Sequence, residues 1–420
     1  MVNPTEVNPA DVATTLCEAF QATAIAFADE IALRAYGQSG ALTWSDYAAR
    51  VHRVAAGLAS LGVGRGDMVA LMLTNRPEAL IVDAAAMHLG AIPFSVYNTS
   101  SPEQLGYLFG HAETEVVVTE RAFAESVLAV AARLARLREV VLVDASLPGT
   151  TTLAELEAAG PPDFDLAEQW RAVGADDIAT VIYTSGTTGP PKGVELTHHN
   201  LISQWRLVNN VHPIPPRGRM VSYLPMAHLG DRTAAHYAAM LSGASVTCVA
   251  DGRAVVTALA EIHPTMWMAV PRIWEKLRSA LEPTVRAVTD PAARAELAAS
   301  LRTQLGLDRV QLLLSGAAPI APEVLNFFAD LGLGIYECWG MTETCAAATL
   351  SPVGEHRVGT VGKAIPGIEV ALADDGELLV RGPTVMRGYR GDPQRTAEAI
   401  DPDGWMHTGD IGRIDEDGYV

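Results

Sequence analysis

Between residues 45 and 143, short apolar segments alternate with amphipathic segments. Residues 45–61 carry apolar side chains at helical spacing, namely Tyr47, Val51, Val54, Leu58 and Leu61. The strand-like segments that follow are residues 68–73, 91–96, 115–119 and 139–143. Two helix-like segments begin at Pro77 and Pro102, and a third covers residues 121–136. This alternation predicts βα units whose strands pair in parallel.

A second alternating block follows residue 194. Its strand-like segments are residues 220–224, 244–249, 265–269 and 310–314. The helix-like segments between and after them are residues 231–241, 253–262, 271–301 and 320–331. Residues 146–176, which join the two blocks, are richer in Pro, Gly and acidic residues, and we interpret them as a surface connection.

The pattern changes again from about residue 346. Short Val-, Ile- and Leu-rich segments alternate with turns such as Asp374-Asp375-Gly376, which is typical of antiparallel hairpins. We therefore predict an α/β fold with two α/β subdomains, residues 1–190 and 191–345. A small antiparallel β-barrel or sheet follows in residues 346–420.

The composition narrows the classes of function. The chain has 420 residues, of which 49% are apolar, and its formal net charge of −19 argues against a nucleic-acid-binding surface. The four cysteines form no CxxC pair, which indicates reduced thiols in the cytoplasm. We find neither a secretory signal nor an apolar segment of transmembrane length. We therefore expect a soluble cytoplasmic protein, and peripheral contact with a membrane stays open.

Residues 183–193 read Tyr-Thr-Ser-Gly-Thr-Thr-Gly-Pro-Pro-Lys-Gly and follow the apolar segment 178–182. Glycines let backbone N–H groups approach an anion, hydroxyls donate further hydrogen bonds, and lysine adds positive charge. Pro190 and Pro191 separate Gly189 from Lys192, which excludes a Walker loop and a kinase-like P-loop protein. A solvated flexible loop is the alternative. We interpret the string as a loop that binds a polyphosphate.

Two clusters follow strand-like segments and suit a nucleotide. Ser315-Gly316-Ala317-Ala318-Pro319 offers small residues against which a flat group can lie, although an ordinary turn fits equally well. In residues 336–344, the indole of Trp339 can stack on a purine and the carboxylate of Glu343 can hold Mg²⁺. The structural alternative is a core indole and an acidic residue in the first turn of a helix.

Two further clusters carry single polar candidates. Asp410 follows Gly409 in Trp405-Met406-His407-Thr408-Gly409-Asp410 and can accept hydrogen bonds from ribose hydroxyls. His228 ends the segment Tyr223-Leu224-Pro225-Met226-Ala227-His228. Loop aspartates more often cap turns, and lone histidines are usually structural. Each cluster alone therefore indicates little, and their order and spacing carry the argument.

In this order and spacing, the phosphate loop and the four clusters resemble the adenylate-forming superfamily of acyl-CoA synthetases, firefly-type luciferases and peptide-synthetase adenylation domains. The resemblance extends from about Ala32 to the last residue. Bacterial long-chain fatty acid–CoA ligases are further resembled by residues 269–276. Residues 359–363 and 380–389 resemble them too, but this second pattern is shared more widely in the superfamily. The resemblance implies ATP-dependent activation of a long-chain fatty acid to acyl-AMP and then to acyl-CoA. ATP, Mg²⁺ and coenzyme A would take part.

The resemblance also implies a role for individual residues. The residues that would contact the ATP phosphates are Thr184, Ser185, Gly186, Thr187, Thr188, Gly189 and Lys192. Ala317 and Ala318 would flank the adenine, the backbone of Glu337 and Cys338 would read its edge, and Trp339, in place of the commoner tyrosine, would stack on it. Thr342 would reach a phosphate, Asp410 would bind the ribose, and His228 would lie near the acyl carboxylate. Glu343 and Thr184 would hold Mg²⁺, and Thr184, Lys192, His228 and Glu343 would take part in catalysis.

In this family a mobile C-terminal domain, which carries a lysine that assists adenylation, follows an Asp-Gly-Tyr stretch. Here that stretch is Asp417-Gly418-Tyr419, directly before the last residue. The resemblance thus implies an N-terminal domain alone, with weak activity. Two alternatives stay open: an acyl-AMP ligase that delivers to a carrier protein, against which residues 269–276 weigh, and a fragment that binds nucleotide or acyl-adenylate with negligible turnover. Acyl chain length and oligomeric state also stay open.

Overall fold

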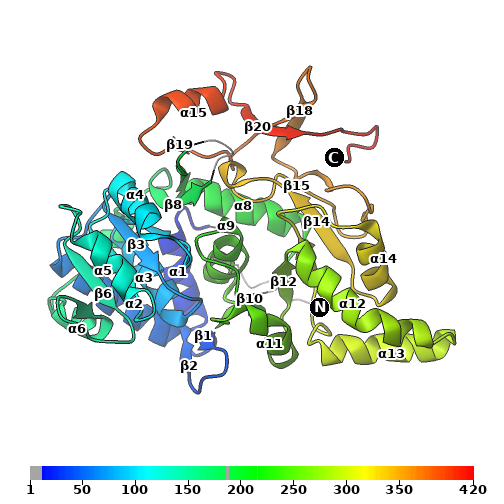
Figure 1. Ribbon diagram of the computed structural model, residues 1–420, viewed down its shortest axis with the longest axis horizontal. Helices are drawn as coiled ribbons and strands as arrows, with labels where there is room; N and C mark the ends of the chain where they lie inside the picture. The colour runs from blue at the N-terminus through cyan, green and yellow to red at the C-terminus, as the bar shows by residue number, and fades with distance from the viewer. Residues whose placement is uncertain (1–11, 186–188, 215) are drawn as a thin grey trace.

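The computed structural model describes residues 12–185, 189–214 and 216–420. The N-terminal α/β units occupy one end of the molecule and the helices α12–α14 the other (Figure 1). The C-terminal strands and α15 lie across one side of both (Figure 1).

The first sheet has the strand order β4-β3-β5-β6-β7 and is parallel throughout. Its strands are β3 (Met68–Met72), β4 (Ile92–Ser95), β5 (Val116–Thr119), β6 (Glu139–Leu142) and β7 (Thr151–Thr152). The helices of this region are α1 (Leu16–Ala26), α2 (Trp44–Ser60), α3 (Pro77–His88), α4 (Pro102–Ala112) and α5 (Ala124–Ala131). The prediction of parallel βα units is confirmed here.

A second sheet has the order β12-β13-β14-β15-β16. Its strands are β12 (Met266–Ala269), β13 (Leu312–Ser315), β14 (Ile335–Trp339), β15 (Thr349–Leu350) and β16 (Lys363–Ala364), of which the first three are parallel and the last two join antiparallel. The helices around it are α11 (Val255–Ile262), α12 (Pro271–Ala287), α13 (Pro291–Gln304) and α14 (Pro322–Asp330). The predicted strand-to-helix turn at residues 315–319 therefore lies between β13 and α14.

Two sheets join segments that are far apart in the sequence. One has the order β10-β11-β1-β2, with β1 (Ile31–Ala35), β2 (Ala41–Thr43), β10 (Arg219–Ser222) and β11 (Ser245–Cys248). The other has the order β19-β9-β8, with β8 (Ile178–Thr184), β9 (Lys192–Thr197) and β19 (Gly388–Tyr389). Helix α8 (His198–Val211) follows β9 directly. The division into three subdomains stays a prediction.

The C-terminal region contains the antiparallel sheet β17-β18-β20, as its turn pattern predicts. Its strands are β17 (Glu369–Leu372), β18 (Glu377–Arg381) and β20 (Met406–Ile411), and α15 (Pro393–Ala399) precedes β20. Gly376 closes the β17–β18 turn with φ +88°, a conformation that side-chain-bearing residues rarely adopt.

Two sequence-based expectations are wrong. Residues 271–301 do not form one helix, because Asp290 caps a new helix whose first residue is Pro291. Residues 146–176 are more than a surface connection, since they hold β7, α6 (Leu153–Ala159) and α7 (Leu166–Arg171). Helix α6 packs so closely on α2 that a Cβ at Gly57 would lie 2.1 Å from the Leu156 carbonyl oxygen.

A buried ion pair joins the first α/β region to the helix expected at residues 231–241. That helix consists of α9 (Leu229–Asp231), a π-helical turn η2 (Arg232–Tyr237) and α10 (Ala238–Ser242). Arg232 Nη1 donates to Asp83 Oδ2 of α3 at 2.5 Å and to the Tyr237 hydroxyl at 2.6 Å. Both charged side chains have an exposed fraction of 0%. The pair fixes η2 against α3.

Two smaller expectations can be compared with the structure. In the described part of the chain, no helix is both long enough and apolar enough to cross a membrane. All four cysteines are free, as expected from their spacing, and Cys17, Cys248 and Cys345 are buried.

We predict that Asp83→Ala lowers the free energy of unfolding by about 3–5 kcal/mol, because it leaves the buried Arg232 guanidinium without its counter-charge. Urea denaturation followed by circular dichroism measures this. The matched control is Asp330→Ala, which removes an exposed carboxylate paired with Arg294 and should leave the transition midpoint unchanged. Equal midpoints for both variants would contradict the prediction.

Candidate active site

The predicted phosphate loop joins two paired strands. Thr184, the last residue of β8, lies opposite Lys192, the first residue of β9. Ser185 and Gly189 are exposed at the two ends of the loop. Three predicted phosphate-binding residues, Gly186, Thr187 and Thr188, lie outside the described residues.

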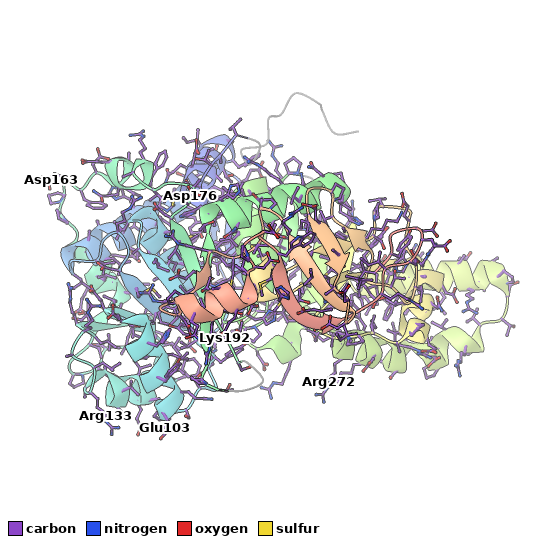
Figure 2. The ribbon with its side chains drawn as sticks, turned by 90° about the horizontal axis from the view of Figure 1, so that it is seen from above. Glu103, Arg133, Asp163, Asp176, Lys192 and Arg272 are labelled. Atoms are coloured by element: carbon purple, nitrogen blue, oxygen red, sulfur yellow. The ribbon has the colours of Figure 1, made fainter. Side chains whose placement is uncertain are left out.

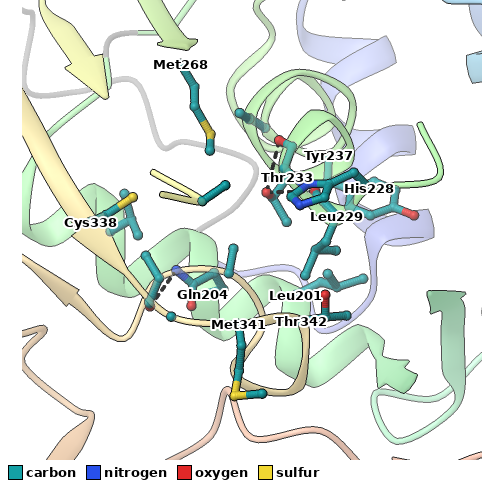
Figure 3. A pocket seen from close by; sticks show the side chains of 18 of the residues that line it. Leu201, Gln204, His228, Leu229, Thr233, Tyr237, Met268, Cys338, Met341 and Thr342 are labelled. Atoms are coloured by element: carbon teal, nitrogen blue, oxygen red, sulfur yellow. Dashed lines mark hydrogen bonds between the residues drawn. The ribbon is translucent and has the colours of Figure 1, made fainter. Parts of the chain in front are cut away.

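A cavity of about 490 Å³ adjoins this loop. The predicted site residues that line it are Thr184, Ser185, Lys192, His228, Ala317, Cys338, Thr342 and Glu343. They come from four separate parts of the chain. Figure 3 shows Met268 and Cys338 on one side of the cavity, facing His228 and Leu229 on the other.

The rest of this main cavity is mostly apolar. Its wall includes Leu201, Trp205 and Val208 of α8, Tyr237, Ala238 and Leu241 of η2 and α10, Met266 and Met268 of β12, and Leu314 of β13. Sequence analysis did not identify these residues as part of a site. The helical spacing of Leu201, Trp205 and Val208 is a detectable signal, but the same spacing describes any core-facing helix.

His228 lines the main cavity at the start of α9. It is the N-cap of α9, and its Nδ1 accepts a hydrogen bond from the Gly230 backbone N–H at 3.0 Å. Burial lowers the pKa of the His228 imidazole below its ordinary value. The imidazole is therefore neutral at physiological pH.

A second cavity, of about 390 Å³, shares Thr184, Ser185, His228 and Thr342 with the main one. Much of its remaining wall comes from Ser95, the last residue of β4, and from Tyr97, Thr99 and Ser100, which follow that strand. The shared residues mark the junction of the two cavities. This junction is the place in the structure where groups from both cavities can meet.

Lys192 and Glu343 are connected through Tyr389. Lys192 Nζ donates to the Tyr389 hydroxyl at 3.1 Å, and that hydroxyl donates to Glu343 Oε1 at 2.8 Å. Burial and the neighbouring Glu343 raise the pKa of the Tyr389 phenol, so the phenol keeps its proton. The sequence signal for Tyr389 was limited to its position in residues 380–389. Figure 2 shows Lys192 beside the C-terminal segment, in the middle of the molecule.

Thr184 and Glu343 have atoms suited to a magnesium ion. Thr184 Oγ1 is buried and has no hydrogen-bond partner among the residues that the structure describes. Glu343 is 4% exposed, and Tyr389 is the only described residue whose hydrogen bond reaches its carboxylate. No group of three or more His, Cys, Asp or Glu side chains in the described ranges could hold a metal. Mg²⁺ commonly binds one or two carboxylates plus substrate phosphates, and this donor set fits that mode.

The predicted adenine and ribose residues lie beside the main cavity. Trp339 Nε1 donates to Asp410 Oδ2 at 2.8 Å, which joins the predicted stacking and ribose-binding residues. Glu337 lies opposite Ser315 in the β13–β14 pair, and burial raises the pKa of its carboxyl to about 7. Ala318 is exposed next to Ala317, which lines the cavity. Ala318, Glu337, Trp339 and Asp410 are not part of the cavity wall.

Known proteins share both the sequence and the fold. The chain is 45% identical over 309 residues to fadD11 of Mycobacterium tuberculosis, which is named as a fatty-acid–CoA ligase; the match covers 65% of this chain and 54% of that protein. It is 34% identical over 413 residues to the long-chain-fatty-acid–CoA ligase FadD15 of the same species, over 90% of this chain and 68% of that protein. The chain thus spans only about half the length of fadD11.

Among solved structures, apo MatB from Rhodopseudomonas palustris aligns with a TM-score of 0.79 and 26% identity, over 99% of this chain and 78% of that chain. The inhibitor-bound N-terminal domain of FACL13 from M. tuberculosis aligns with a TM-score of 0.81 and 23% identity, over 96% and 98%. The latter match shows the fold alone. The profile described as "AMP-binding enzyme" matches residues 20–390. The chain belongs to the AMP-binding enzyme family, whose adenylate-forming members share its fold.

Proposed function

We propose that this chain forms the ATP- and acyl-binding part of a long-chain fatty acid–CoA ligase. The observation that carries the proposal is the main cavity, in which the predicted phosphate-binding residues and an extended apolar wall enclose one continuous space. An amphiphile with a carboxylate head suits such a space, because apolar side chains bury the tail and polar groups bind the head. The names of fadD11 and FadD15 support the same substrate class.

In the proposed reaction, a carboxylate oxygen of the fatty acid attacks the α-phosphorus of ATP. The bond between the α-phosphorus and the bridging oxygen breaks, pyrophosphate leaves, and acyl-AMP remains. Lys192 and the loop after Thr184 bind the phosphates and offset their charge. The neutral His228 lies near the carboxylate and orients it without forming a tight ion pair.

Magnesium would be held by Glu343 and Thr184 together with phosphate oxygens. When bound, it supplies charge neutralisation on the phosphates. Trp339 would stack on the adenine between Ala317, Ala318 and the backbone of Glu337 and Cys338. Asp410 would bind the ribose. The Trp339 indole N–H donates to Asp410 Oδ2 and so orients the carboxylate.

In the second half-reaction, the sulfur of coenzyme A would attack the acyl carbonyl carbon and its thiol proton would pass to water. The bond from that carbon to the phosphate oxygen would break, and AMP would leave with this oxygen. The relatives named as CoA ligases support this acceptor over a carrier protein. The junction of the two cavities, at Thr184, His228 and Thr342, offers a second direction of approach to the carbonyl carbon.

We predict that Trp339→Ala weakens ATP binding by about 1–3 kcal/mol, because base–aromatic stacking contributes about that much. Trp339→Tyr keeps the aromatic face and should retain most of the affinity. Isothermal titration calorimetry with ATP and Mg²⁺ measures both. Equal affinities for the alanine and tyrosine variants would show that Trp339 does not stack on the base.

We predict that non-hydrolysable acyl-adenylate mimics (N-acylsulfamoyl adenosines) bind more tightly as the acyl chain lengthens. Each methylene buried against the apolar wall should add about 0.8 kcal/mol until the cavity is full. Ala238→Phe narrows that wall and should abolish the gain for long chains while it leaves the acetyl mimic unaffected. Affinity independent of chain length in the parent protein would contradict the assignment of a fatty acid.

We predict that the chain catalyses exchange of pyrophosphate into ATP only when a long-chain carboxylate is present, and without coenzyme A, because adenylation precedes thiol attack. Exchange that is independent of any carboxylate would contradict the proposed reaction. Acyl transfer to a carrier protein in place of coenzyme A would support the alternative acceptor.

A further inference from the structure

Tyr389 occupies the space between the two charged residues to which the proposed function assigns the phosphates and the magnesium ion. Its hydroxyl accepts from Lys192 Nζ at 3.1 Å and donates to Glu343 Oε1 at 2.8 Å. The Lys192 ammonium also lies 4.3 Å from the centre of the Tyr389 ring. One phenol therefore contacts the cation through its face and its oxygen, and the carboxylate through its proton.

The backbone holds Tyr389 rigidly in this place. Tyr389 pairs with Val194 of β9, two residues after Lys192, so the tyrosine and the lysine are positioned by the same pair of strands. The Tyr389 backbone N–H donates to Thr396 Oγ1 at 2.9 Å. The preceding Gly388 has φ +154°, and a Cβ there would lie 2.8 Å from the Thr396 methyl carbon, so the approach requires glycine.

Glu343 is also bound to the segment that carries Tyr389 through its backbone. The Met386 backbone N–H donates to the Glu343 carbonyl oxygen at 2.8 Å. The segment that carries Tyr389 therefore fixes both the backbone and one carboxylate oxygen of Glu343. No other described residue donates a hydrogen bond to that carboxylate, although the residue is only 4% exposed. A buried carboxylate with so few donors depends strongly on each of them.

We propose that Tyr389 is a positioning residue, whose hydroxyl holds the Lys192 ammonium and the Glu343 carboxylate at the separation that a magnesium-bound polyphosphate needs. The hydrogen bond from Tyr389 goes to Oε1, no described residue donates to Oε2, and Glu343 lines two cavities. The same hydroxyl keeps the lysine from forming a direct ion pair with Glu343, which would withdraw both groups from the ligand. This inference rests on the proposed function and adds a residue to it.

The test compares Mg²⁺-dependent ATP binding in the parent protein and in Tyr389→Phe, by calorimetry at a series of Mg²⁺ concentrations. The phenylalanine keeps the ring beside Lys192 and removes the hydroxyl alone. We expect ATP affinity at saturating Mg²⁺ to fall about tenfold, as for loss of a hydrogen bond to a charged group. The Mg²⁺ concentration for half-maximal binding should rise. Tyr47→Phe is the matched control, since its buried hydroxyl donates to the Leu80 carbonyl at 3.1 Å, and it should change neither quantity.

Double variants separate positioning from a general structural role. If Tyr389 acts through its two partners, Tyr389→Phe should have a smaller effect in Glu343→Gln and in Lys192→Met than in the parent. If the parent protein binds ATP, two results would overturn the inference: an unchanged Mg²⁺ dependence in Tyr389→Phe, or effects of Tyr389→Phe that are fully additive with those of either partner variant. A parent protein that binds no ATP would instead refute the proposed function, and this inference with it.

Discussion

Strand β9 is hydrogen-bonded along both of its edges, and the candidate site depends on this pairing. On one edge β8 places Thr184 opposite Lys192, so the loop between them has both ends fixed. On the other edge β19 places Tyr389 beside Val194. Residues almost two hundred positions apart thus meet because a single six-residue strand pairs with both segments. Strand pairing therefore fixes the backbone positions from which the side chains of Lys192 and Tyr389 extend.

The charged groups around the cavity differ in how their burial is compensated. Asp83 and Arg232 are fully buried and satisfy each other, together with Tyr237, so they stabilise the wall and are closed to ligands. Glu343 is almost as buried but has few donors, and Thr184 Oγ1 has none among the described residues. Because unsatisfied buried polar atoms cost free energy, groups of the second kind favour a ligand that completes them. Among the groups near the cavity, this contrast distinguishes the Asp83–Arg232 network from Glu343 and Thr184.

Much of the architecture could be predicted from the sequence, because strand and helix periods and turn residues are local signals. The parallel pairing of the strands around β3, the hairpin at Gly376 and the strand ends near Ser315 and Trp339 all follow from such signals. The π-helical turn η2 was not predicted, because the contact between its Arg232 and Asp83 joins residues far apart in the sequence and has no local signal. Tyr389 was missed for a similar reason. Its contacts with Lys192 and Glu343 arise from strand pairing at long range, and nothing in the residues next to it indicates them.

The helices that form the apolar wall of the main cavity follow its polar residues closely along the chain. Helix α8, which supplies part of the apolar wall, follows β9 without a linker, and Thr197 caps it with a hydrogen bond from the Asn200 backbone N–H. The other part of the wall, η2 and α10, begins four residues after His228 and is held by the Asp83–Arg232 pair. The positions of Lys192, His228 and the apolar wall relative to one another are thus set by short, anchored segments. Because both segments are anchored in this way, we infer that the side-chain volumes along the apolar wall, rather than movements of the backbone, set the room that the main cavity offers a ligand.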